Sequence, residues 1–299
     1  MITVFGSTNL DQVGTVSRLP QPGETVAGGT FSMAAGGKGA NQALAARRAG
    51  ADVRHFGAVG NDAFADIALE KLRADAVDLS GMRTTDGASG VAMIFVDKEG
   101  ENVIAVLPGA NGQLTPADAE AALADMDKGA ILLLQQEIPQ AATVRALALA
   151  REKGVIAILN TAPFLSDTPE VAARAAMVVA NESEFALLCG DRDGALDDLM
   201  RDWARNHDQT IIVTLGPDGA KAATPDDFIA VSSLRITPVD TVGAGDTFCG
   251  YLAAALDAGL PLKQAMRRAA YAGSLACLNQ GAQPAIPYAK DVDAALAKG

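Results

Sequence analysis

The sequence predicts an α/β fold in which helices cover both faces of a mostly parallel sheet. Over the second half of the chain, short apolar segments alternate with Ala- and Leu-rich segments of helical spacing, which is the pattern of parallel sheets. Two strand-rich pieces, approximately residues 8–34 and 88–107, break this alternation. We interpret them as a small β-sheet lid inserted into a single domain, 1–299. The 299 residues are 49% apolar but only 4% aromatic, so we expect a large core of aliphatic side chains.

The elements of the first half follow from apolar runs and the residues that end them. An apolar run that stops at Gly6 predicts a buried strand, and an Ala-rich run that stops at Gly50 predicts a helix. Two apolar runs around the polar turn 98–101 predict a hairpin. The predicted elements are a strand at 2–5, strand propensity at 25–33, a helix at 39–48, a strand at 53–59, an amphipathic helix at 64–76 and hairpin strands at 91–96 and 102–107.

The second half repeats strand and helix in alternation. Thr115, Pro116 and Asp118 have the pattern of an N-cap, a proline at the first helical position and an acidic first turn, which predicts a helix start. The predicted strands beyond it are 131–134, 155–159, 177–179 and 211–215, and the predicted helices are 141–153, 196–206, 247–258 and 262–278. We detect no internal repeat and no long linker.

Charge and composition exclude several classes of protein. The chain carries 24 basic and 36 acidic residues, a formal charge of −12, which argues against a nucleic-acid partner because phosphate backbones select clustered Lys and Arg. The three cysteines have no CxxC spacing, which favours a reducing, cytoplasmic compartment over a disulfide framework or a zinc site. The first residues lack the basic region of a secretory signal, and no apolar run approaches the ~18–20 residues of a membrane span.

The most informative segment is the string 240–248, which opens the predicted helix 247–258. Small residues at Gly243, Ala244 and Gly245 allow the backbone to approach a ligand, and amides at a helix start attract an anion. Asp246 lies at the same point, so a carboxylate and an anion site converge. Phosphoryl transfer to a hydroxyl needs this pairing of a base with donors for the phosphate charge. The other interpretation, an Asp N-cap after a Gly-rich turn, stays open here.

A second Gly-rich segment, 36–42, opens the predicted helix 39–48. It resembles a P-loop, but Lys38 is followed by Gly39 rather than by Ser or Thr. It is not a dinucleotide fingerprint either, because Gln42 stands where the last Gly belongs. A Gly-rich turn with a solvated Lys38 is the alternative to a ligand site.

Polar side chains follow several predicted strands. Asn9 and Asp11 lie just past the first strand, at the carboxyl edge where open α/β sheets bind ligands, and they suit the hydroxyls of a sugar. An Asx turn is the alternative for this pair. Glu137 follows another apolar strand and is a further ligand candidate.

Two more segments are candidates for a nucleotide. Asn181 and Glu184 have the spacing of a capping box, and the alternative is a carboxylate that orients the waters of Mg²⁺. The tight turn that contains Thr214, Gly216 and Gly219 also follows a strand, where it could cradle phosphates.

Taken together, these segments resemble the ribokinase-like (PfkB-type) family of sugar kinases over nearly the whole chain. Two long signatures in the correct order, 36–41 and 240–246, carry the resemblance. Further landmarks are 6–11, 22–25, 109–111, the pair Asn181 and Glu184, and 281–284. The resemblance implies a three-layer α/β/α sandwich with a β-sheet lid that often doubles as a dimer clasp.

The resemblance also implies roles for individual residues. Asp246 would be the catalytic base, and the amides of Gly243, Ala244 and Gly245 would form the anion hole. The positions that match sugar contacts are Asn9, Asp11, Gly37, Lys38, Asn41, Glu137 and Asp246. Asn181 and Glu184 match the nucleotide–Mg²⁺ region, and the ATP site is matched by Thr214, Gly216 and Gly219.

A monovalent cation, usually K⁺, is implied next to the anion hole. The matching positions are Asp240, Val242, Ala276, Asn279, Gly281 and Ala285. Several of them supply backbone carbonyls, so their side chains can vary. Ala285 departs from the pattern, because relatives commonly carry a hydroxyl there, and this departure weakens the expectation of K⁺ activation.

We therefore expect ATP-dependent phosphorylation of a furanose, most specifically of D-ribose at O5, with Mg²⁺ and with a lid that excludes water. The expected ligands are a small sugar and ATP, with no nucleic acid and no membrane, and the expected assembly is a homodimer through the lid. A kinase for a nucleoside, deoxyribose or a hexose stays open. A dehydrogenase lacks a GxGxxG after the first strand, and Asp246 and Lys38 count against a catalytically silent sugar-binding protein.

Overall fold

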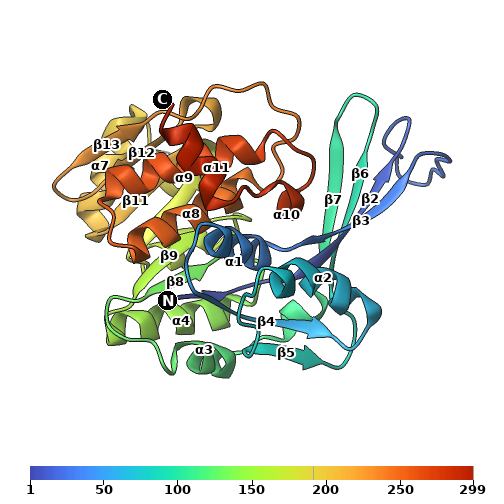
Figure 1. Cartoon of the computed structure of the whole chain (residues 1–299), viewed down its shortest axis with the longest axis horizontal. Helices are drawn as coiled ribbons and strands as arrows, with labels where there is room; N and C mark the ends of the chain where they lie inside the picture. Colours follow the sequence, from blue (N-terminus) through green and yellow to red (C-terminus); the bar gives the residue numbers. More distant parts are fainter. Residues whose placement is uncertain (191, 299) are drawn as a thin grey trace.

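The computed structural model describes residues 1–190 and 192–298, and its centre is a nine-stranded sheet (Figure 1). From β5 to β11 every pair of neighbouring strands is parallel, and β12 runs antiparallel to both of its neighbours. The strand order is β13 (Phe228–Val231), β12 (Ala220–Ala223), β11 (Thr210–Thr214), β10 (Met177–Asn181), β9 (Ile156–Asn160), β8 (Ile131–Leu134), β1 (Ile2–Phe5), β4 (Val53–Gly60) and β5 (Met82–Thr85). The predicted, mostly parallel sheet is confirmed.

A layer of helices covers each face of this sheet. Along β8, Ile131 and Leu133 point into one core cluster, while Leu132 and Leu134 point into the other, as side chains alternate along a strand. The first face carries α1 (Lys38–Arg48), α2 (Ala63–Ala74), α8 (Ala244–Asp257), α9 (Leu262–Ala276) and α11 (Ala289–Leu296). The second face carries α3 (Pro116–Leu123), α4 (Gln140–Lys153), α5 (Thr168–Ala172), α6 (Glu182–Cys189) and α7 (Leu196–His207). The α/β/α sandwich is therefore confirmed.

Helices α1 and α8 cross closely. A Cβ added at Gly250 of α8 would lie 2.5 Å from the Cβ of Ala45 in α1, so the crossing leaves no room for a side chain at Gly250. The same crossing brings Asp246, in the first turn of α8, within hydrogen-bond distance of Asn41 and Gln42 of α1. Small residues in both helices thus set the position of Asp246.

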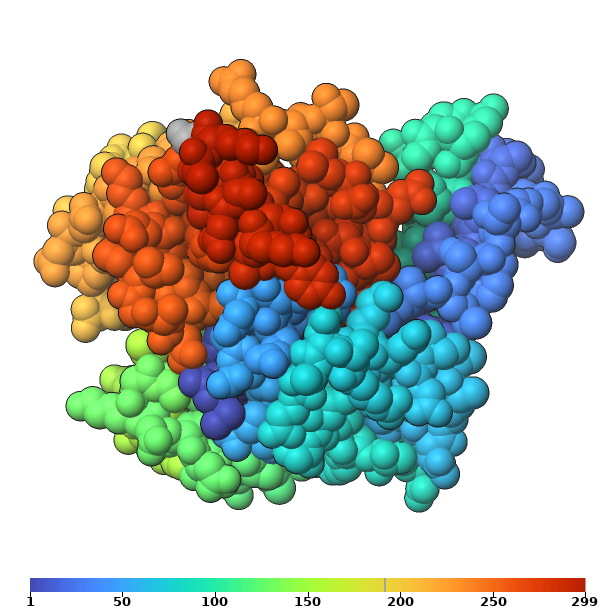
Figure 2. Space-filling model, in the orientation of Figure 1, coloured from blue at the N-terminus to red at the C-terminus, as the bar shows by residue number. Residues whose placement is uncertain are grey.

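A separate four-stranded sheet projects from the body (Figure 2, blue and teal, upper right). Its strand order is β3 (Phe31–Gly36), β2 (Asn9–Thr15), β6 (Gly90–Val96) and β7 (Asn102–Leu107). In the strand register, Asp11 lies opposite Ala34 and Ala92, so these residues share one face of the sheet. The other face is exposed and apolar, and it carries Phe31, Met33, Met93, Phe95, Val103 and Leu107.

Two predictions about elements were wrong, and some strands were not predicted. The strand predicted at 25–33 begins only at Phe31, and residues 25–30 have no regular structure. The helix predicted from 247 begins at Ala244, because Gly243 in a left-handed conformation (φ 76°) caps it and the low helix propensity of glycine hides this start in the sequence. Strands β5, β12 and β13 of the large sheet were not predicted.

The cysteines Cys189, Cys249 and Cys277 are unpaired and buried. Burial raises the pKa of the Cys249 and Cys277 thiols, which keeps both of them protonated. Within the described residues, no helix combines the length and apolar content needed to span a bilayer. The shorter elements used below are η1 (Gly109–Gln113), η2 (Gly216–Asp218) and α10 (Ala282–Ala285).

Candidate functional site

Asp246 lies in the first turn of α8, and its carboxylate does not cap the helix. The N-cap is Gly243, without a side-chain hydrogen bond, so the interpretation of Asp246 as an N-cap was wrong. Instead, Asn41 Nδ2 donates to one carboxylate oxygen of Asp246 at 2.9 Å, and Gln42 Nε2 donates to the other at 3.0 Å. Asp246 is buried, with 9% of its surface exposed. A carboxylate is therefore held by two amides from another helix.

Three residues with backbone amides, Gly243, Ala244 and Gly245, directly precede Asp246 at the start of α8. The Ala244 amide donates to the Thr241 carbonyl at 3.3 Å, whereas no described residue accepts from the amides of Gly243 and Gly245. A Cβ added at Gly245 would meet no atom within 4 Å, so the backbone is open to a ligand at this position. Amides at a helix start attract anions. The turn can therefore bind an anionic group beside the carboxylate.

Asp11, Lys38, Glu137 and Asp246 form one charged cluster. Burial, together with the negative charges of Glu137 and Asp246, raises the pKa of Asp11 to about 7, although the positive charge of Lys38 opposes this rise. Burial lowers the pKa of Lys38, but the attraction of Asp246, Glu137 and other acidic groups outweighs it, so the net pKa is raised. Lys38 is only partly exposed, so the interpretation of a solvated lysine was wrong. The cluster carries more negative than positive charge around one cation.

Glu137 is tied to the Gly-rich turn before α1. It accepts a hydrogen bond from Ser7 Oγ at 2.6 Å and one from the Lys38 amide at 3.0 Å. Gly37 has φ 89°, and a Cβ there would lie 2.7 Å from the Asn9 amide, so this position requires glycine. Sequence reasoning missed Ser7, because its partner is 130 residues away and leaves no local pattern.

Asn9 and Asn41 use their amides differently. Asn9 is 2% exposed, and its side-chain oxygen accepts from Asn111 Nδ2 at 2.7 Å, so it is engaged at the base of the small sheet. Asn111 also bonds both backbone groups of Thr8. The side-chain oxygen of Asn41, in contrast, is buried and finds no partner among the described residues. Asn41 therefore has an acceptor to offer a ligand while its nitrogen holds Asp246.

The predicted nucleotide residues lie at the carboxyl ends of adjacent strands. Asn181 ends β10 opposite Thr214, which ends β11. The Glu184 amide donates to the Asn181 side chain at 2.8 Å, and the Glu184 carboxylate accepts from the Asn181 amide at 3.1 Å, so the capping box is confirmed. Glu184 also accepts from Thr161 Oγ1 at 2.8 Å. Glu184 is among the groups that raise the pKa of Lys38, which links this region to the charged cluster.

The turn after β11 is shaped by two glycines. Gly216 (φ 54°) begins η2, and Gly219 (φ 98°) ends it. A Cβ at Gly219 would lie 2.0 Å from the Val231 carbonyl, so β13 packs directly against this turn. Gly216 has open space around it and lies at the exposed surface.

Asp240 joins the segments predicted to hold a monovalent cation. Its carboxylate accepts from the Val242 amide at 3.0 Å and from the Gly281 amide at 2.8 Å. Ala276 ends α9, Asn279 follows it, and Ala285 lies buried in α10. Within residues 1–190 and 192–298, no group of three His, Cys, Asp or Glu side chains could hold a metal ion. Any cation here would thus rely on Asp240 and backbone carbonyls, the oxygen donors that suit a hard cation.

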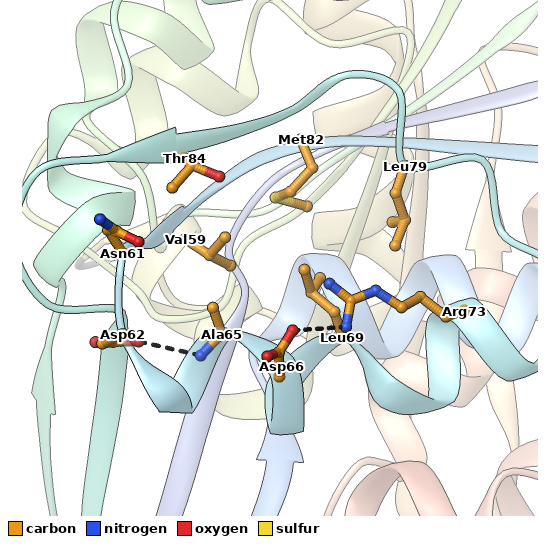
Figure 3. A pocket seen from close by; sticks show the side chains of 11 residues that line it. Val59, Asn61, Asp62, Ala65, Asp66, Leu69, Arg73, Leu79, Met82 and Thr84 are labelled. Carbon is orange, nitrogen blue, oxygen red and sulfur yellow. Dashed lines mark hydrogen bonds and ion pairs between the residues drawn. The ribbon is translucent and has the colours of Figure 1, made fainter.

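A cavity of about 330 Å³ lies between α2, β4 and β5 (Figure 3). Its wall includes Asp62, which caps α2 by accepting from the Phe64 and Ala65 amides. Asp66 and Arg73 form an exposed ion pair at 3.0 Å on the same wall. None of the predicted site residues lines this cavity. Its charged groups are already paired or used in capping, so we do not place the functional site there.

Comparison with known proteins places the chain in a family. The model of the pfkB family of carbohydrate kinases matches residues 1–289. Over 293 residues the chain is 39% identical to a bifunctional ribokinase/ribose-5-phosphate isomerase A of Fructilactobacillus sanfranciscensis, covering 96% of this chain but only 54% of that longer protein. It is 35% identical to the ribokinase of Bacillus subtilis, with 99% of both chains covered.

Solved structures agree with these sequence matches. The ribokinase of Arabidopsis thaliana, described as complexed with ribose and ATP, is 30% identical to this chain and superposes with a TM-score of 0.88. The superposition covers 99% of this chain and 98% of that one. The fold, the arrangement of the two sheets and the sequence matches lead to one conclusion: the chain belongs to the pfkB family of carbohydrate kinases.

Proposed function

We propose that this carbohydrate kinase transfers the γ-phosphoryl group of ATP to O5 of D-ribose and releases ribose 5-phosphate and ADP. The observation that carries the proposal is the first turn of α8, where a buried carboxylate and open backbone amides lie beside the cluster of Asp11, Lys38 and Glu137. The ribokinase names of the relatives and the ribose and ATP of the Arabidopsis thaliana structure support this choice of substrates.

In this proposal Asp246 is the base. It accepts the proton of the O5 hydroxyl while O5 forms a bond to the γ-phosphorus and the bond from that phosphorus to the bridging oxygen of ADP breaks. The amides of Gly243, Ala244 and Gly245 would stabilise the charge of the transferring group. Ala244 would have to release Thr241 to take part, because its amide donates to that carbonyl.

The sugar would lie between the small sheet and α1. Asp11 and Glu137 are acceptors for its hydroxyls, the buried Asn41 oxygen is a third, and Lys38 is a donor. We propose that Asn9 acts indirectly, because Asn111 already engages its oxygen, and that Gly37 makes room for the sugar. The small sheet would then act as a lid, with insertions at 8–34 and 88–107, and exclude water that would hydrolyse ATP.

ATP would lie along the carboxyl ends of β10 and β11. The residues that we assign to it are Asn181, Glu184, Thr214, Gly216 and Gly219. Glu184 keeps one carboxylate oxygen outside its capping box and could orient waters of a bound Mg²⁺. When bound, Mg²⁺ would neutralise phosphate charge during the transfer.

We propose K⁺ as an activator with reduced affinity. Asp240, Val242, Ala276, Asn279, Gly281 and Ala285 are the residues that we assign to it. The carboxylate of Asp240 binds two backbone amides and still has lone pairs for a cation. Ala285 has no side-chain oxygen to add, which lowers the number of donors.

We also propose a homodimer that forms through the exposed face of the small sheet. Phe31 is 66% exposed, Phe95 43% and Val103 54%, and the register places all three on the face away from Asp11. Exposed apolar side chains that gather on one face of a sheet mark a surface that binds another protein chain. The unpaired, buried cysteines are consistent with a reducing, cytoplasmic location.

The test is ATP consumption with Mg²⁺ across ribose, deoxyribose, fructose and several nucleosides, each with and without K⁺, followed by NMR identification of the phosphorylated oxygen. We expect ribose to give the highest kcat/KM and ribose 5-phosphate as product. A higher kcat/KM with a nucleoside, deoxyribose or a hexose would refute the choice of substrate. No turnover with any of them would favour a silent sugar-binding protein.

A further inference from the structure

We propose that Gln42 is the residue that orients Asp246 for proton abstraction, and that Gln135 locks Gln42 in place. The inference rests on the proposed function, because it concerns the same base. Gln42 and Gln135 are both 0% exposed, so neither can exchange its partners for solvent.

The side-chain amide of Gln42 has a single workable orientation. Its nitrogen donates to Asp246 at 3.0 Å and to the Asn160 side-chain oxygen at 3.3 Å. Its oxygen accepts from Gln135 Nε2 at 2.7 Å. A flipped amide would place oxygen against the carboxylate and nitrogen against the Gln135 donor, which would remove all three hydrogen bonds. The Gln42 nitrogen is therefore fixed toward Asp246.

Gln135 reaches Gln42 because Gly6 leaves room for it. A Cβ added at Gly6 would lie 2.0 Å from Gln135 Oε1, so the side chain occupies the space that any larger residue would take. Gln135 follows β8 and Gly6 follows the neighbouring strand β1. The amide chain thus connects the central sheet to the first turn of α8.

Asn41 and Gln42 bind different oxygens of Asp246, and of the two only Gln42 has both of its polar side-chain atoms hydrogen-bonded within the protein. Asn41 carries a buried side-chain oxygen without a partner, so it is expected to share itself between Asp246 and the sugar. Both polar atoms of Gln42 are used inside the protein, which leaves it nothing to offer a substrate. Gln42 is accordingly a positioning residue, and its loss should lower turnover more than sugar affinity.

The experiment is a double-mutant cycle on the full chain. The variants are Gln42→Leu, Asp246→Asn and the pair together, with kcat and the KM values for ribose and ATP measured for each. Gln209→Leu is the matched control, because Gln209 is also a buried glutamine (4% exposed) with three hydrogen bonds, to Trp203 and to the Ala172 and Ala175 carbonyls. The melting temperature of every variant shows whether that variant is folded at the temperature of the assay.

We expect Gln42→Leu to lower kcat roughly 10- to 100-fold, as a displaced catalytic group does, with the ribose KM changed less than about threefold. In the Asp246→Asn background the same change should lower kcat by less than about threefold, because residues that act as a unit are not additive. Gln209→Leu should keep the wild-type kcat. If Gln42→Leu does not fold, Gln135→Leu replaces it in the cycle, with a smaller expected loss and the same non-additivity.

Two results would overturn the inference, and they differ. If Asp246→Asn lowers kcat as expected, but Gln42→Leu (or Gln135→Leu) lowers kcat by the same factor in that background as in the wild type, then Gln42 does not act through Asp246. The same conclusion follows if Gln42→Leu lowers kcat no more than Gln209→Leu does. If Asp246→Asn itself turns over at a near-normal rate, the proposed function loses its base and the inference falls with it.

Discussion

Asp11 offers a prediction in which stability and binding move in opposite directions. Its carboxylate packs against Gly36. Burial, together with the charges of Glu137 and Asp246, raises its pKa from 3.8 to about 7. Between these two pH values the folded state binds more protons than the unfolded state, so the free energy of unfolding falls as the pH rises from about 4 to about 7. The change Asp11→Asn removes the ionisable group and with it this loss.

The size of the effect follows from the shift. A difference of about three pKa units at about 1.4 kcal/mol each predicts that Asp11→Asn stabilises the protein by up to about 4 kcal/mol at pH 8. At pH 5 only the part of the shift between pH 3.8 and pH 5 contributes, so the expected stabilisation by Asp11→Asn is at most about 2 kcal/mol. Asparagine has one acceptor oxygen where the carboxylate has two, so ribose affinity should fall roughly 10- to 100-fold.

The assays are urea unfolding at pH 5 and pH 8 and calorimetric titration with ribose. Asp52→Asn is the control, because that side chain is 87% exposed and should change stability by less than about 0.5 kcal/mol at either pH. A gain for Asp11→Asn that is the same at both pH values, or no gain at pH 8, would refute the buried-charge reasoning. Unchanged ribose affinity would remove Asp11 from the sugar site.

Three other variants test separate parts of the structure. Gly37→Ala forces a Cβ to within 2.7 Å of the Asn9 amide at φ 89°, so urea unfolding should detect a loss of about 1–3 kcal/mol, and a loss under about 0.5 kcal/mol would contradict the strain. Ala285→Ser adds an oxygen to the proposed cation site and should lower the K⁺ concentration for half-maximal activation; an unchanged value would place the cation elsewhere. The double change Phe31→Glu and Phe95→Glu puts charge on the exposed sheet face and should yield monomers in sedimentation velocity, whereas a wild-type protein that sediments as a monomer would contradict the proposed dimer.

Local patterns predicted six of the nine strands of the large sheet and the hairpin of the small sheet, but not the contacts between elements. The bounds of β1, β8 and the hairpin strands β6 and β7 agree with the prediction to within one residue, because each has a clear end signal in the sequence. The start of α8 was placed three residues late, because Gly245 and Asp246, which are both weak helix formers, lie in its first turn. Tertiary packing against α1 stabilises this first turn, which has a low intrinsic helix propensity.

In the candidate site, too, local patterns indicated individual residues but not the contacts between them. The sequence signatures indicated Asp246, Lys38 and Asn41 as candidates. In the structure Asn41 donates a hydrogen bond to Asp246, and Lys38 lies close enough to Asp246 for its pKa to be raised. They did not point to Gln42 as a partner of Asp246, since the two are 204 residues apart and a glutamine in a helix has many ordinary roles. The sequence did not indicate Gln135 either, because its contact with Gln42 depends on the pairing of β1 with β8 and on the space at Gly6.

The most direct test of the proposed phosphoryl transfer compares Asp246→Asn with the wild type in ribose-dependent turnover and in ribose binding. The proposed role of Asp246 as base predicts that kcat falls by about 10²–10⁴ while the Kd for ribose changes much less, because asparagine has nearly the same size and keeps one oxygen that can accept from Asn41 or from Gln42. A variant that keeps near-normal turnover would contradict the assignment of Asp246 as the base.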